Sequence, residues 1–154
     1  MSLPPLTLRR AGPADAVAVD ALTQAAYAKW VPIIGRKPMP MTADYAKAVV
    51  EHRIDLLEDG ASLAALIEMS LAPDHLLIVN IAVDPAFQGQ GLGTRLLAHA
   101  EDVARESGLG ELRLYTNQLM AANVALYSRR GYEKYREEAF RGGVAIHMRK
   151  LIAG

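Results

Sequence analysis

The feature that most constrains this 154-residue chain is a glycine-rich turn between two apolar segments of different periodicity. Residues 76–83 form an apolar run of strand length, and Pro85 ends it because proline has no N–H to donate. Residues 92–107 place apolar side chains on one helical face, and Gly108 after them favours a helix end. Glycines occupy every second position from 89 to 93. The segment therefore predicts a strand, a tight turn and an amphipathic helix in direct succession.

The rest of the chain supplies the other elements of a mixed fold. Strands are expected at residues 6–9, 53–58, 62–70, 111–115, 132–136 and 144–151, with a hairpin turn at Asp59–Gly60. Helices are expected from residue 13 to about 29, from residue 42 onward and from 121 to 130. Residues 30–41 hold three prolines and a glycine, which predicts a loop. This order predicts an α+β domain with a mostly antiparallel, partly mixed sheet.

Composition and charge narrow the class of protein. The chain is 51% hydrophobic and 22% charged, which suits a single domain over residues 1–154. Seventeen basic residues balance 17 acidic ones, so no nucleic-acid partner is expected. The absence of cysteine excludes disulfides and cysteine nucleophiles, and no metal site is expected. Two prolines near the start argue against a signal peptide, and the apolar run that Asn80 interrupts is too short for a membrane span. We therefore expect a cytoplasmic protein without a membrane partner.

The glycine turn has the composition of an anion site. Glycines leave backbone N–H groups uncovered, and the helix that follows adds the positive end of its dipole, which suits a phosphate or pyrophosphate. The alternative is that the glycines only permit a tight turn and a close contact between helix and sheet. A Walker loop is excluded because Gly93 is followed by Thr94 and Arg95. A dinucleotide fingerprint fails because the required sixth glycine falls on Thr94 or Leu96, which disfavours other nucleotide-binding classes.

These residues resemble a known family. The sequence QGQGLG at residues 88–93 matches the Q/R-x-x-G-x-G/A signature of the GNAT superfamily of acyl-CoA-dependent N-acetyltransferases. The preceding IAVDPAF at 81–87 matches the strand end that leads into that signature, and residues 123–132 are similar to the family's later Asn-Tyr-Gly-aromatic segment. The resemblance covers residues 53–151 and implies a GNAT-like sheet of about seven strands flanked by about four helices.

The resemblance also implies acetyl-CoA as cofactor. The backbone N–H groups of the turn would hold its pyrophosphate, which involves Gln88, Gly89, Gln90, Gly91, Leu92, Gly93 and Thr94. The pantetheine arm would run along the strand at 76–83, which splays from the next strand, and would contact Ile81, Ala82 and Val83. Asn123 would lie against the cofactor, and Tyr127 would hydrogen-bond the departing thiolate. The alternative for Tyr127 is a packing role between helix and sheet.

The acceptor must react as a neutral amine, so a base is useful. Glu68 and His75 are the candidates, and for each a solvated surface position is the alternative. The histidines at 52, 99 and 147 show no metal or triad spacing and are interpreted as structural or surface residues. The acceptor pocket is expected at Tyr27, Trp30, Ile33, Tyr45 and Asn80, although Asn80 is equally compatible with an ordinary bonded core position.

Together these features predict an N-acetyltransferase that joins an acetyl group to a primary amine by direct attack in a ternary complex. The acceptor is a small-molecule or peptide amine that the sequence does not identify. The alternative is a non-catalytic acyl-CoA-binding or regulatory module on the same fold. A homodimer is compatible with the sequence, which carries no signal for it.

Overall fold

The computed structural model describes residues 6–153, and its centre is one seven-stranded sheet with the order β1-β2-β3-β4-β5-β7-β6. Neighbouring strands are antiparallel except for β4 and β5, which are parallel. This confirms the predicted α+β class with a mostly antiparallel sheet. The strands are β1 (Thr7–Arg10), β2 (Arg53–Asp59), β3 (Ser62–Leu71), β4 (Leu76–Val83), β5 (Glu111–Asn117), β6 (Glu133–Phe140) and β7 (Gly143–Leu151).

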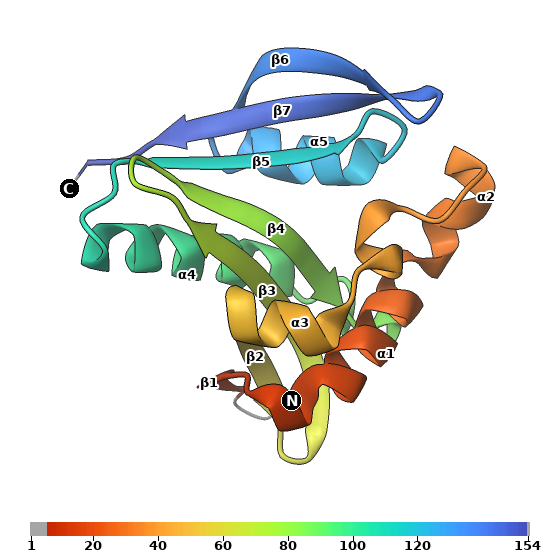
Figure 1. Cartoon of the computed structure of the whole chain (residues 1–154), viewed down its shortest axis with the longest axis vertical. Coiled ribbons are helices and arrows are strands. Elements are labelled where there is room, and N and C mark those ends of the chain that lie inside the picture. The colour runs from red at the N-terminus through yellow and green to blue at the C-terminus, as the bar shows by residue number, and fades with distance from the viewer. Residues whose placement is uncertain (1–5, 154) are drawn as a thin grey trace.

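Helices cover both faces of the sheet. They are α1 (Ala16–Tyr27), α2 (Val31–Ile34), α3 (Tyr45–Glu51), α4 (Leu92–Glu106) and α5 (Ala121–Arg129). In Figure 1, α3 lies in front of β2 and β3 while α4 runs behind the sheet. Two buried clusters result, one between the sheet and α4 and one between the sheet and α1 and α3. None of the described helices combines the length and apolar character required to cross a bilayer.

The region between α1 and α3 differs from the expected loop. It contains the short helix α2 and a 3-10 turn at Met39–Thr42. Pro32 suits the first turn of α2 because its fixed φ is already helical, and Gly35 ends the helix with a φ of 84°. The expectation of an irregular loop is therefore wrong for these residues, since the prolines begin helical turns instead of excluding them. The single domain predicted over residues 1–154 stays a prediction, and residues 1–5 and 154 lie outside the described part.

A bulge in β4 decides which side chains face which core. Glu68 pairs with Asn80 and Met69 pairs with Ile78, so Val79 is an extra residue in β4. Ile78 belongs to the α4-side cluster, whereas Asn80 two positions later bonds to side chains of α1 and α3. Without the extra residue, strand alternation would keep both on one face. The bulge therefore turns Asn80 toward the α1–α3 side.

The parallel pair β4–β5 separates soon after it begins. Its register covers only Leu76 with Leu112, Leu77 with Arg113 and Ile78 with Leu114. Beyond this point β4 continues along β3, and β5 continues along β7. Figure 1 shows the two strands diverging toward their carboxyl ends. The predicted splay of this strand is confirmed, and it leaves one edge of β4 without a strand partner in the described chain.

Candidate active site

A cavity of about 490 Å³ lies where β4 and β5 separate. Its walls come from both splayed strands, from α1, α3 and α5, and from the turn between β6 and β7. This volume is within the usual range of small-molecule sites. It brings together these predicted residues: Tyr27, Tyr45, Glu68, Asn80, Ile81, Asn123 and Tyr127.

Other predicted residues lie apart from this cavity. Trp30 is buried in the α1–α3 core, and the side chain of Ile33 is exposed. His75 bonds to the exposed Asp74 at the start of β4, with 2.7 Å between Nδ1 and Oδ1. Ala82 is buried in the core. The acceptor roles of Trp30 and Ile33 stay predictions, and the cavity walls give them no support.

A buried polar network forms one wall of the cavity. The hydroxyl of Tyr27 donates to Oδ1 of Asn80 over 2.9 Å, and Nδ2 of Asn80 lies 3.2 Å from the hydroxyls of both Thr23 and Tyr45. Tyr45 donates to the carbonyl of Pro40 over 2.7 Å. Burial raises the pKa of Tyr27 and of Tyr45, so both phenols stay neutral. The network satisfies Asn80 and fixes α1 and α3 against the bulge of β4.

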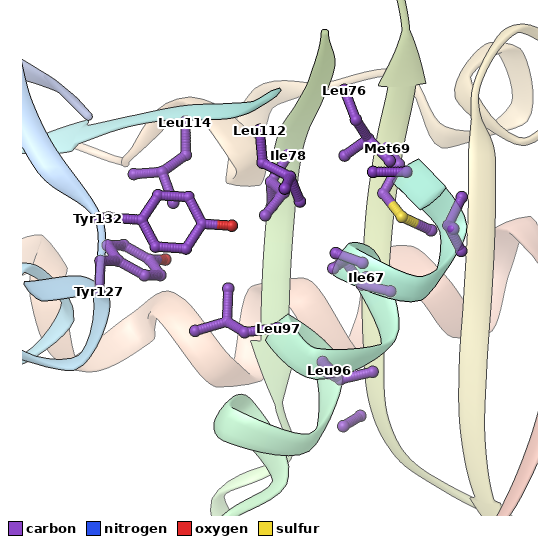
Figure 2. Packing of buried hydrophobic residues seen from close by; sticks show 14 of the residues in the cluster. Ile67, Met69, Leu76, Ile78, Leu96, Leu97, Leu112, Leu114, Tyr127 and Tyr132 are labelled. Atoms are coloured by element: carbon purple, nitrogen blue, oxygen red, sulfur yellow. The ribbon is translucent and has the colours of Figure 1, made fainter. Parts of the chain in front are cut away.

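Tyr127 contributes a phenol on the α5 side. Burial raises the pKa of Tyr127 to about 12. Its ring makes an edge contact with Tyr132, with 6.2 Å between centroids, and Figure 2 shows the two rings beside Leu114 and Leu97. Within residues 6–153 its hydroxyl has no hydrogen-bond partner, although the residue lines the cavity. Tyr127 is therefore a neutral phenol with a free donor at the cavity wall.

Glu68 meets His52 at the opposite wall. Nδ1 of His52 lies 2.6 Å from Oε2 of Glu68, and the Glu68 side chain is only 4% exposed. The alternative of a solvated Glu68 is wrong, because β3 is a central strand with helices on both sides. Sequence reasoning missed His52 as a cavity residue. A signal was present: the Asp59–Gly60 hairpin pairs Ile54 with Glu68, which brings the preceding His52 close.

The glycine turn presents free backbone donors beside the far end of β4. Gly89 and Gly91 have φ values of 81° and 77°, which other residues rarely adopt, while a Cβ on Gly93 would lie 3.1 Å from Leu126 of α5. Within residues 6–153, no backbone N–H from 89 to 94 donates a hydrogen bond. The side chain of Gln88 closes the turn by donating to the carbonyl of Val83 over 3.2 Å.

This turn fits a diphosphate, since its free amides stand at the first turn of a 15-residue helix. It does not line the cavity. The unpaired edge of β4 runs between the two. The arrangement suits a long ligand with an anionic end at the turn and its other end in the cavity.

A sequence profile described as the acetyltransferase (GNAT) family matches residues 19–132, which include both the glycine turn and Tyr127. The chain belongs to the GNAT acetyltransferase family. A curated relative, ribosomal protein bS18-alanine N-acetyltransferase of Escherichia coli K12, is 36% identical over 78 residues, or 51% of this chain and 53% of the relative. The chain thus spans about half the length of the curated relatives it matches.

Solved structures of other GNAT proteins share the fold over nearly the whole chain. The E. coli ribosomal-protein-S18-alanine N-acetyltransferase superposes with a TM-score of 0.79 at 26% identity, covering 97% of this chain and 95% of that one. The PaiA N-acetyltransferase of Thermoplasma acidophilum, solved with coenzyme A, gives 0.76 at 15% identity, with 96% and 98% covered. At 15% identity, the similarity to the PaiA structure shows a shared fold and nothing further.

Proposed function

We propose that this GNAT protein transfers the acetyl group of acetyl-CoA to a primary amine by direct attack in a ternary complex. The observation that carries the proposal is the arrangement along β4. Free amides stand at its carboxyl end, and a cavity with an acid–base pair and a free phenol opens at its bulge. The names of the curated relatives support the same activity.

The chain's own groups account for cofactor binding. The amides of residues 88–94 would hold the pyrophosphate, and the free edge of β4 at Ile81, Ala82 and Val83 would bind the pantetheine arm as an added strand. Asn123 lines the cavity on the α5 side and would contact the arm there. When bound, acetyl-CoA supplies the acetyl thioester. A backbone N–H of β4 would polarise the carbonyl of that thioester.

Tyr127 would donate a hydrogen bond to the sulfur. Burial holds the pKa of Tyr127 above the ordinary thiol value near 8.5, so complete proton transfer to a thiolate is uphill. A donated hydrogen bond to the developing charge avoids this cost. Solvent would then protonate the released thiolate.

The acceptor amine would enter the cavity from the side of α3 and the β6–β7 turn. Glu68, with His52 bonded to it, is the acid–base group at this wall. The cavity accommodates a small amine or the end of a peptide. The chemistry at the nitrogen is the same for both.

The test is turnover with a panel of amines that includes small amines, amino acids and a peptide with a free N-terminus. CoA release is followed with a thiol reagent, and the acetylated product is identified by mass spectrometry. Binding of acetyl-CoA without any CoA release would favour the non-catalytic module. Tighter binding of ATP or NAD than of acetyl-CoA in calorimetry would exclude both the N-acetyltransferase and the non-catalytic acyl-CoA-binding module.

Replacing Tyr127 with Phe removes only the hydroxyl, so the ring should keep its contact with Tyr132. We expect kcat to fall at least tenfold because the departing sulfur loses its donor; the loss of one oxyanion donor typically costs about 10²–10³. The dissociation constant of acetyl-CoA, measured by calorimetry, should change less than threefold. Unchanged kcat would remove Tyr127 from the mechanism.

A further inference from the structure

We propose that His52 is the group that accepts the amine proton, and that Glu68 positions it. This inference rests on the proposed acetyl transfer and deepens it. It starts from the part-buried contact between Nδ1 of His52 and Oε2 of Glu68, which spans 2.6 Å at the cavity wall.

The contact fixes the state of the imidazole. An ionised carboxylate can only accept a hydrogen bond, so Nδ1 must carry the hydrogen in the contact with Glu68. A neutral imidazole then holds its lone pair on Nε2. Nε2 of His52 has no protein partner within residues 6–153, and the His52 side chain is 32% exposed. The free nitrogen is therefore a base at the cavity.

The alternative base, Glu68 itself, is less suited to the task. Its side chain is 4% exposed, and one oxygen is already committed to His52. A free imidazole ordinarily titrates near 6.5 and a free carboxyl near 4.3, so an imidazole is the stronger base at neutral pH. A carboxylate that orients a histidine and stabilises its protonated form is a recurrent catalytic arrangement.

The position of the pair also fits the reaction. Tyr27, Tyr127 and Glu68 all line this one cavity, together with His52. As the amine nitrogen bonds to the acetyl carbon, one N–H proton moves to Nε2 of His52. The carbon–sulfur bond breaks, sulfur keeps the electron pair beside Tyr127, and solvent protonates it. The imidazolium returns its proton to solvent.

Charged and titratable groups from the neighbouring elements also face this space. They are Tyr27 of α1, Arg36, Lys37 and Asp44 between α2 and α3, Tyr45, Lys47 and Glu51 of α3, Tyr115 of β5, Tyr127 of α5 and Arg141 of the β6–β7 turn. Lys47 and Glu51 pair with each other at 3.8 Å. Because these groups would complicate a simple pH profile, the decisive measurement is chemical rescue.

The experiment compares His52→Ala with the wild type on the best amine of the panel, with and without added imidazole. We expect kcat/KM to fall about 100-fold, the lower bound usual for a lost general base. Imidazole should restore turnover in proportion to its concentration, and more basic substituted imidazoles should restore more. Glu68→Gln should lose about tenfold and gain nothing from imidazole, because His52 remains but is less well oriented.

The matched control is His99→Ala. His99 forms a similar pair with Asp55 outside this cavity, at 2.6 Å, and its loss should leave turnover within threefold and unresponsive to imidazole. His52→Ala activity within threefold of the wild type overturns this inference alone. The inference is also overturned if His52→Ala loses most of its turnover, still binds acetyl-CoA and is not restored by imidazole. A wild type that acetylates no amine overturns the proposed function first.

Discussion

The two faces of the sheet carry matching histidine–carboxylate pairs that stand in different surroundings. On the α1–α3 face, His52 bonds to Glu68 at the cavity wall; on the α4 face, His99 bonds to Asp55. Both contacts span 2.6 Å, and the side chains of Glu68 and Asp55 are 4% and 3% exposed. Local geometry alone therefore does not separate a structural pair from a chemical one.

The neighbouring charges do separate them. Asp55 also has Arg10 Nε at 3.1 Å and Arg53 Nε at 3.1 Å, whereas within residues 6–153 Glu68 has only His52 as a side-chain partner. Burial acts to raise the pKa of Asp55, but the hydrogen bond from His99 and the charge of Arg53 outweigh it, so its pKa is lowered. Asp55 is held as a permanent anion that ties β1, β2 and α4 together. At Glu68, Nε2 of His52 has no protein partner within residues 6–153, and His52 lines the cavity.

Asp55→Asn tests the structural side and should have the largest effect on stability. The substitution removes the anion and leaves the two arginines and His99 without their partner, so we expect a loss of about 3 kcal/mol, typical of a broken buried ion pair. Urea unfolding followed by circular dichroism measures it. Asp102→Asn is the matched control, because Asp102 is 67% exposed beside Arg105 and should cost less than about 0.5 kcal/mol. Equal losses of free energy of unfolding in Asp55→Asn and Asp102→Asn would show that the buried ion pairs of Asp55 do not stabilise the fold more than an exposed pair does.

Acidification should abolish the difference between the wild type and Asp55→Asn. Because the pKa of Asp55 is lower in the folded protein, its contribution is fully present above the unfolded value near 3.9 and is lost as pH falls through the folded value. The gap in free energy of unfolding should therefore be constant from pH 7 to about 5 and shrink below about 4. Unfolding curves at a series of pH values measure it. A gap that stays constant down to pH 2 would show that the charge of Asp55 is not what stabilises the fold.

The sequence predicts much of this framework because its signals are local. The Asp59–Gly60 turn, the apolar run ended by Pro85 and the glycine turn all depend on neighbouring residues, and each appears where predicted. Glu68 and Asn80 interrupt apolar strands, which shows that they need buried partners but not which ones. Their partners depend on the packing of α1 and α3 and on the bulge at Val79, which reverses the alternation of β4.

Both histidine pairs depend on contacts across the fold, and of the two only the pair at Glu68 had a sequence signal, the register of the Asp59–Gly60 hairpin. His99 meets Asp55 only because α4 packs against the sheet, which brings together residues 44 positions apart. Nothing in the spacing of either histidine distinguishes the two environments. The acceptor-pocket roles of Trp30 and Ile33 stay predictions that the cavity walls do not support. Their apolar character predicts a pocket wall, yet Trp30 packs into the core and Ile33 faces outward.

Glu68→Gln tests the pair at the cavity through its effect on stability, which should be smaller than that of Asp55→Asn. The amide oxygen of Gln can still accept from Nδ1 of His52, and no arginine loses a partner, so we expect a loss of about 1 kcal/mol. Urea unfolding measures it beside Glu51→Gln, whose side chain is 54% exposed and whose change should be near zero. A loss of about 3 kcal/mol, equal to that of Asp55→Asn, would mean that the Glu68 charge chiefly holds α3 against the sheet. A small loss of free energy of unfolding together with slowed turnover would show that Glu68 contributes mainly to the reaction and little to the stability of the fold.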